Sequence, residues 1–265
     1  MKLPSILVII LLLLSSCSNN QDTSLSFENH YPIGEISIIK IQMNKGQILV
    51  KKAAVDQILI KGITHQPGDL TITKDKGTLF LVHEESTTRD QIEIHLPGEI
   101  LLDIQAFNVN IELNGLIGYA NIRNTAGDIS LNDYKGEAYL WAGRGDIEVT
   151  GGEGKAVVIG EHGSLSVSQF FGPISMTTIM GNIQFRGAEN TSGDILMEID
   201  HGSVQAVLPE NTNYQIAIDT ASGDLVCLGG DLQRTITGCT GSTGNGVGFL
   251  RIRTVSGRIE FQILP

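Results

Sequence analysis

The sequence lacks any cluster of lysine or arginine. Of its 265 residues, 18 are basic and 29 are acidic, which gives a formal net charge of −11 at pH 7. A protein that binds nucleic acid or an anionic lipid surface concentrates positive charge on one face, and no stretch of this chain does so. We therefore expect no nucleic-acid partner, while the acidity itself identifies no other partner.

Helical periodicity is also missing, and proline, aromatic residues and cysteine are scarce. The chain has 7 prolines, 3 cysteines, one tryptophan and 5% aromatic residues, against 31 glycines. Because 41% of the residues are hydrophobic, the glycine indicates turn-rich β-structure rather than disorder. The 6 histidines are scattered singly, without the spacing of metal ligands, and no glycine-rich phosphate loop precedes a helix. We expect no metal and no cofactor.

The N-terminus resembles an export signal. Lys2 is followed by an apolar run from Ile6 to Leu14, which is shorter than the roughly 20 residues that span a bilayer and is typical of a signal-peptide core. The run ends in Leu-Ser-Ser-Cys, which resembles the bacterial lipoprotein signal. The alternative is an ordinary secretory peptide with a chance cysteine. We predict a lipoprotein signal peptide over residues 1–16.

In such lipoproteins the cysteine becomes the lipid-bearing first residue of the mature chain. We predict that Cys17 is lipidated and that residues 17–34 form a flexible polar tether. The chain would then be anchored through its lipid to the outer face of a bacterial membrane. Ser18 favours the outer membrane where the host has two membranes.

Two further cysteines remain for an oxidising compartment. Cys227 and Cys239 are flanked by glycines, and an even pair at this spacing is suited to closing a loop with a disulfide. Two free thiols are the alternative in a bacterium without strong oxidation.

The middle of the chain is organised by glycine at every ninth residue. An apolar residue stands two positions after each glycine, and another stands two positions later. A fixed period with strict alternation inside it is typical of stacked β-strands in a repeat architecture. The glycines are Gly118, Gly127, Gly136, Gly145, Gly154, Gly163, Gly172 and Gly181, and the first apolar residues are Ala120, Ile129, Ala138, Ile147, Ala156, Leu165, Ile174 and Ile183.

One strand and one turn fit into each nine-residue unit, so two units make an 18-residue coil. Glycine at the corners permits the positive φ that a branched residue resists, and stacked coils bury their apolar positions in one continuous core. The sequence predicts a single all-β domain over residues 35–265, a parallel β-solenoid with about two strands per coil. Its strands are less regular over 35–108 and regular over 109–187. Coils with a Gly/Thr-rich loop follow over 188–265, after the period slips by three residues at 188–190.

The two predicted faces of the solenoid differ. Polar residues point outward on the face that contains Ile129 and Ile147, whereas Tyr139, Trp141, Val157 and Ile159 point outward on the face of the alanines. Such an apolar patch marks a surface for a protein partner or a carbohydrate. Large open patches are uncommon on monomers, so we favour the alternative that the strands of residues 35–100 fold over this face and bury it.

Two residue patterns resemble catalytic sites. Asp128 and Asp146 occupy equivalent places on adjacent coils, as do the stacked acids of pectin-cleaving β-helices, but an aspartate after glycine also stabilises turns. His162 and His201 each precede Gly-Ser, without the strained elbow of a serine nucleophile. We interpret both patterns as structural and assign no catalytic residue.

The Gly-Asp-Ile motifs at residues 126–129 and 192–195 and the related Gly-Asp-Leu motif at 222–225, together with Ile-His-Leu-Pro at 94–97, resemble the bacterial putative-adhesin β-strand-repeat family. This resemblance covers residues 35–263 and implies a right-handed solenoid in a domain of unknown function. It carries over no catalytic residue. With the signal, it implies a non-enzymatic cell-envelope protein that serves as a surface scaffold or adhesion module.

The alternative is a sensing or accessory subunit that binds another envelope protein. A polysaccharide lyase or hydrolase is the less favoured third class. An envelope protein or a surface polysaccharide is accordingly the expected partner besides the membrane.

Overall fold

The computed structural model describes residues 25–32, 34–54, 57–65, 70–83 and 90–265. All regular structure in these ranges is β-strand. The strands are β1 (Leu25–Pro32), β2 (Ile38–Lys52), β3 (Gln57–Thr64), β4 (Leu70–Asp75), β5 (Thr78–His83), β6 (Asp90–Leu96), β7 (Ile100–Asn114), β8 (Ile117–Ala126), β9 (Ile129–Arg144), β10 (Ile147–Ser168), β11 (Ile174–Arg186), β12 (Ile195–Pro209), β13 (Tyr214–Leu228), β14 (Gln233–Arg234), β15 (Gly238–Ser242) and β16 (Gly248–Leu264).

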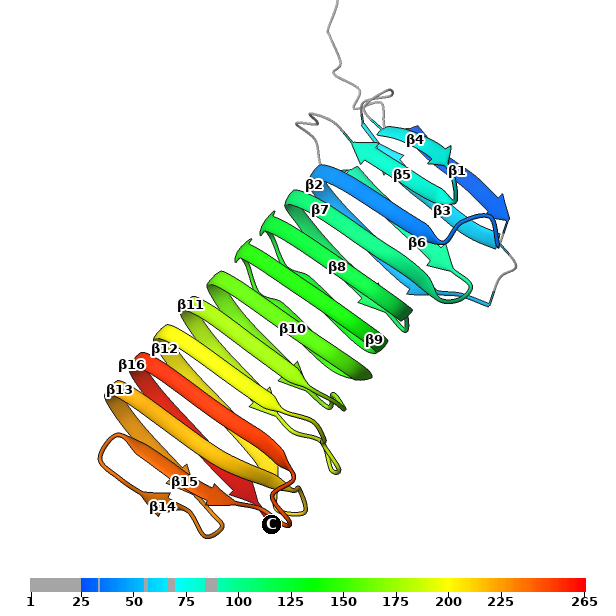
Figure 1. Cartoon of the computed structure of the whole chain (residues 1–265). Coiled ribbons are helices and arrows are strands. Elements are labelled where there is room, and N and C mark those ends of the chain that lie inside the picture. Colours follow the sequence, from blue (N-terminus) through cyan, green and yellow to red (C-terminus); the bar gives the residue numbers. More distant parts are fainter. Residues whose placement is uncertain (1–24, 33, 55–56, 66–69, 84–89) are drawn as a thin grey trace, which may run out of the picture.

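The strands form a rod of stacked coils, as the sequence predicts (Figure 1). Long strands bend round a corner and so contribute to two flat faces, which we call face I (with Ile129 and Ile147) and face II (with Ala138 and Ala156). From β8 to β11 each residue pairs in parallel with the residue 18 positions away. Between β11 and β12 the offset becomes 21, which confirms the predicted slip at residues 188–190. The chain is a parallel β-solenoid.

The core lies between the two faces. The first inward side chain after the corner glycine is large on face I, where Ile129, Ile147 and Leu165 are buried, and is alanine at Ala138 and Ala156 on face II. Small residues opposite large ones fill a thin two-layer core without voids. Outward residues alternate with these along every strand, so the side-chain positions form columns along the rod.

The N-terminal end departs from chain order. Strand β2 pairs with β7 on one side and with β5 and β6 on the other, so it is an interior strand of the rod. Antiparallel strands then end the sheet: β3 and β1 beyond β6 on face I, and β4 beyond β5 on face II. Residues 25–32 were predicted as part of the tether. They form β1 instead, because β3 offers them a complete antiparallel edge.

The C-terminal end also departs from chain order. Strand β16 lies between β12 and β13, parallel to both, although it comes last in the chain. The intervening segment adds the antiparallel hairpin β14–β15 beside the first half of β13. Chain order alone would place β16 at the end of the rod. It is an interior strand because β13 leaves a vacant position next to β12.

The corner glycines bring the backbones of successive coils into contact. All eight glycines of the nine-residue period have positive φ, from 97° at Gly127 to 152° at Gly181. At Gly154 (φ 128°) a Cβ atom would lie 2.0 Å from the carbonyl oxygen of Gly136. A side chain is therefore excluded twice, by backbone conformation and by space.

We expect Gly154→Ala to lower the free energy of unfolding by at least 1–3 kcal/mol, roughly the strain of a non-glycine residue in this conformation, because the Gly136 carbonyl would also have to move. Urea unfolding measures the loss. Gly98→Ala is the matched control, since no atom lies within 4 Å of its Cβ position. Equal stability of the two variants would show that the corner contact is dispensable.

Candidate functional site

The outward patch predicted on face II is open along the middle of the rod. Neighbouring strands place Tyr139 beside Val157, and Trp141 beside Ile159. Ile159 is 39% exposed and the other three side chains are half-buried. With Asn121, Arg123 and the adjoining residues of β8 and β9, they line a shallow hollow of about 390 Å³.

The prediction that residues 35–100 cover this patch is wrong. Their strands β2 to β6 stack at the N-terminal end and lengthen the rod instead of folding over it (Figure 1). The physical reason is that the edge of β7 still needs hydrogen-bond partners, and β2 supplies them along its whole length.

The aromatic side chains of the patch are held by their neighbours. The ring of Tyr139 lies 5.8 Å from that of Tyr119, and the Lys155 ammonium lies 5.6 Å from the Tyr139 ring centroid. The Trp141 ring lies against Gly143, where a Cβ atom would be 3.3 Å from the indole. Gly143 was not recognised from the sequence, because it falls outside the nine-residue period. Rings fixed in this way lose little further entropy on binding.

Charges at the patch are balanced. Arg123 is adjacent to Trp141 across the sheet and makes no ion pair among the described residues. Glu137 neighbours Lys155, and Asp103 accepts a hydrogen bond of 3.0 Å from Asn121. The surface therefore offers aromatic rings, donors and acceptors without a net field, which suits an uncharged or mixed ligand surface.

The stacked aspartates stabilise the corners of the solenoid. The Asp146 amide donates to Asp128 Oδ1 at 2.9 Å, and the Ser164 amide donates to Asp146 Oδ1 at 2.7 Å. The Asp128 amide donates to Asn110 Oδ1 in the same way. Each side chain thus binds the backbone of the next coil, a structural role that acts between coils rather than within the turn that the sequence predicted. Among the described residues, no group of His, Cys, Asp or Glu side chains is arranged to hold a metal ion.

The two histidines that precede Gly-Ser lie at corners. His201 Nδ1 is 2.6 Å from Ser256 Oγ, on the adjacent strand β16 rather than on its own Ser203. His162 stands between Arg144 and Met180 on neighbouring coils. Neither histidine faces a serine on a strained elbow. Both belong to the columns of residues that stack at the corners of successive coils.

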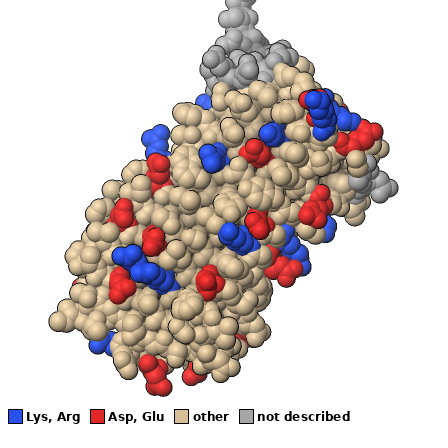
Figure 2. Space-filling model, in the orientation of Figure 1, with Lys and Arg blue, Asp and Glu red and all other residues tan. Residues whose placement is uncertain are grey.

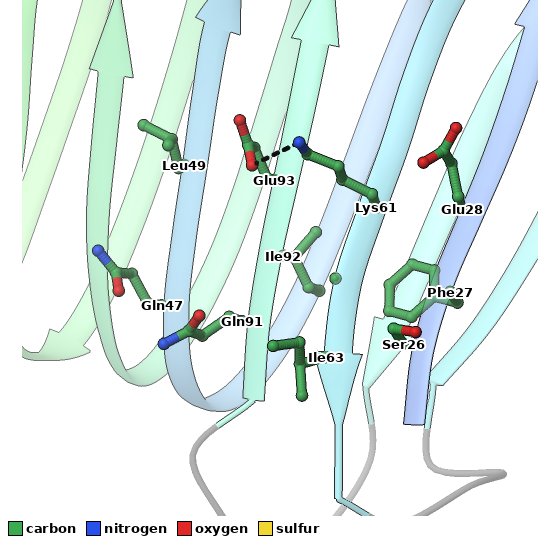
Figure 3. A pocket seen from close by; sticks show the side chains of 11 residues that line it. Ser26, Phe27, Glu28, Gln47, Leu49, Lys61, Ile63, Gln91, Ile92 and Glu93 are labelled. Carbon is green, nitrogen blue, oxygen red and sulfur yellow. Dashed lines mark ion pairs between the residues drawn. The ribbon is translucent and has the colours of Figure 1, made fainter. Parts of the chain in front are cut away.

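A second hollow lies on face I near the N-terminal end, and the sequence did not indicate it. It measures about 490 Å³ and is formed by β1, β3, β6 and β2 (Figure 3). Its apolar part includes Phe27, Leu49 and Ile63, of which Ile63 is 41% exposed. Gln47 and Gln91 line one side of it. No sequence pattern predicts it, because β1 and β3 join it as antiparallel strands and its strands do not follow the nine-residue period.

Glu93 is the centre of the charges at this hollow. It forms ion pairs with Lys51 and with Lys61, the latter at 3.2 Å, and His95 Nε2 lies 2.7 Å from it. The hydrogen bond from Lys51 is the main reason that the pKa of Glu93 falls to about 2, with smaller contributions from His95 and Lys61. The carboxylate is fully engaged by these three partners.

A buried acid lies behind the hollow, inside the core. Asp90 is 1% exposed and accepts from the backbone amide of His65, while the rings of His65 and His83 lie 2.9 and 2.7 Å from its two oxygens. Burial raises the pKa of Asp90, but hydrogen bonds from Thr64, His65 and His83 outweigh it and hold the pKa at about 2. The group joins the ends of β3 and β5 to the start of β6.

Cys227 and Cys239 form a disulfide that joins β13 to β15 at the C-terminal end. Both residues are buried, so the bond lies in the core. The predicted signal peptide and Cys17 lie outside the described residues. Within the described ranges, no helix has the length and apolar character to cross a membrane. Figure 2 shows acidic and basic side chains interspersed over the visible face.

The fold and these surfaces define a β-solenoid that displays its distinctive residues on its exterior. A family model, Toastrack DUF4097, matches residues 36–262, and the chain belongs to that family. The family expected from the Gly-Asp-Ile motifs is thereby confirmed. No curated protein matches the chain.

Solved structures resemble the chain at low identity. A putative adhesin from Bacteroides fragilis is 12% identical, with a TM-score of 0.47, over 91% of this chain and 97% of that one. A putative cell adhesion protein from Clostridium sporogenes is 13% identical, with a TM-score of 0.29, over 91% and 100%. A putative lipid binding protein from Parabacteroides distasonis is 11% identical, with a TM-score of 0.27, over 91% and 97%.

Acid should weaken the N-terminal end of the rod. The folded-state pKa values of Asp90 and Glu93 are about 2, below the roughly 4 of unfolded carboxyls. Their stabilisation is therefore fully present above pH 5 and is lost as the pH falls from about 4 to 2. For the buried Asp90 this loss is on the order of 2 kcal/mol.

Melting temperatures measured from pH 6 to pH 2 test this expectation. Asp90→Asn should lower the melting temperature at neutral pH, and its melting temperature should fall less than that of the wild type as the pH drops from about 4 to 2. Glu148→Gln changes an exposed residue that makes no ion pair among the described residues, so its melting temperature should fall with pH as that of the wild type does. A melting temperature that falls as steeply in Asp90→Asn as in the wild type would contradict the role given to Asp90.

Proposed function

We propose that this protein is a non-enzymatic, lipid-anchored protein of the cell envelope that acts as a surface scaffold or adhesion module. The observation that best supports this proposal is the open patch of Tyr139, Trp141, Val157 and Ile159 in the middle of the rod, which we call the Tyr139–Trp141 patch. Tyrosine, tryptophan and arginine are the residues that dominate binding energy at recognition surfaces. A patch of them on a solenoid face that is otherwise mainly polar supports capture of an envelope protein or a surface polysaccharide.

Membership of the Toastrack family supports a role that does not depend on one catalytic centre. The stacked carboxylates that resemble a lyase site are engaged by backbone amides. This engagement removes the observation that favoured polysaccharide cleavage, so we do not propose it. The sensing or accessory role differs from adhesion only in the identity of the captured partner, which the binding experiment reveals.

Trp141→Ala should abolish capture without unfolding the rod. Loss of a central aromatic anchor costs about 2–4 kcal/mol of binding, which is at least thirtyfold in affinity. The tagged mature protein is tested against immobilised envelope polysaccharides and against purified envelope proteins, with thermal melts in parallel.

Two controls separate binding from folding. Gln184→Ala, an exposed change on face I, should bind as the wild type does. Leu140→Ala, in the core beneath the patch, should lower stability by about 2–5 kcal/mol. Unchanged capture by the Trp141→Ala variant would overturn the proposed role of the patch.

The anchor is tested on Cys17. In a bacterial host, metabolic labelling with a palmitate analogue should mark the wild-type protein, because lipoprotein acylation uses that cysteine. Cys17→Ala should lose the label and leave the membrane fraction. Its Tyr139–Trp141 patch should remain functional, since the patch lies on the folded rod. A labelled Cys17→Ala protein would contradict the predicted anchor.

A further inference from the structure

The described strands leave four edges, two at each end of the rod. Strand β1 ends face I and β4 ends face II at the N-terminal end. At the other end, β14 ends face II, and the second half of β13, Leu225–Leu228, ends face I. An open edge exposes unpaired N–H and C=O groups that can pair with another chain.

Three of these edges carry a polar residue on their inner side. Asn29 of β1 is opposite the buried Ile60, Lys74 of β4 is opposite the buried Leu79, and Arg234 of β14 is opposite the buried Cys239. Directly opposite residues of antiparallel strands point to the same side. A charged or polar inner residue makes a further strand costly, because the residue would be buried between coils.

The fourth edge lacks such a residue. Leu225 and Cys227 point inward beside Ile259 and Phe261 of β16, and Val226 and Leu228 point outward. Leu228 is 43% exposed. The segment pairs with β16 on one side, and no described strand lies on the other. It is therefore the edge best suited to accept a strand.

Face II extends beyond this edge. On face II the sheet continues through β15 and β14, so face I ends two strands earlier, roughly 10 Å by strand spacing. The buried Cys227–Cys239 disulfide connects the two faces at this end, and Leu232 packs partly buried against the core. Arg234 is exposed, lies on the inner side of the hairpin, and makes no ion pair among the described residues. A hydrogen-bonding edge, the half-buried Leu225 and a cation thus occur together at this end of the rod.

We propose that Leu225–Leu228 is a strand-addition site for an extended segment of another protein. The segment would pair with the free edge, place an apolar residue against Leu225, and direct a carboxylate toward Arg234. A second copy of this chain fits this edge less well. If two copies met at their C-terminal ends with the β14–β15 hairpin of each lying against the other, two Arg234 side chains would come together between the faces and repel each other. The site does not depend on the Tyr139–Trp141 patch.

A peptide selection on the full mature chain tests the site. The probe is a displayed library of random peptides about ten residues long, the length of a long strand. We expect enriched peptides to alternate apolar and polar residues and to contain an aspartate or glutamate. Bound peptide should slow hydrogen exchange of the amides in Leu225–Leu228 and leave the Tyr139–Trp141 patch unaffected.

Four variants make the test specific. Leu225→Lys gives this edge an inward polar residue like those of the other three edges and should weaken binding at least about tenfold, whereas the outward change Val226→Lys should not. Arg234→Glu, a surface change that avoids any folding defect of Leu225→Lys, should shift the preference from acidic to basic peptides. Trp141→Ala should bind these peptides normally, so a failure here and a failure of the proposed function are distinguishable.

The proposal is overturned by either of two results. One is a selection that enriches no peptide on the wild-type chain over the Leu225→Lys chain. The other is a set of binders that protects amides elsewhere and ignores Arg234→Glu.

Discussion

The direct contact of backbone on backbone at the glycine corners is the constraint on which the structure depends. The Cβ positions of Gly154, Gly163 and Gly181 each fall about 2 Å from a carbonyl oxygen of the preceding coil. With no side chain to separate them, the corners hold every coil in the same register. Equivalent residues then stack in columns, which is how the corner aspartates reach the next amide and how Tyr139 comes to lie beside Val157. Recognition residues on such a surface are fixed by the scaffold rather than by their own contacts alone.

The regular part of this fold could be predicted from the sequence, because its period is encoded locally. The glycine spacing predicted the 18-residue coil, and the alternation of apolar residues predicted which side chains are buried. The predicted slip near residue 188 is the change of pairing offset between β11 and β12. The order of strands at the two ends could not be predicted in this way. Whether β2 and β16 stack inside the rod depends on pairings between distant segments, which leave no short-range pattern.

The candidate site was foreseen in its residues but not in its setting. Tyr139 and Trp141 stood out as apolar residues at outward positions, while their exposure depended on where residues 35–100 would pack. The contact of the Trp141 ring with Gly143, the hollow around Glu93 and the inward position of Arg234 all arise from neighbours in space. Only the cross-strand register reveals them. The two kinds of acidic residue illustrate the same limit: Asp128 binds the backbone amide of the next coil, whereas Asp90 is buried and binds the side chains of two histidines.

The interior place of β16 also has a consequence for biosynthesis. Within the described ranges, β13 has β16 as its only parallel neighbour, and β16 follows β13 in the chain. This end of the rod therefore cannot form until β16 has been synthesised. A chain that ended before Gly248 would lose the neighbour of β12 as well as that of β13. The C-terminal end of the rod thus depends on a strand that is made after both of its neighbours.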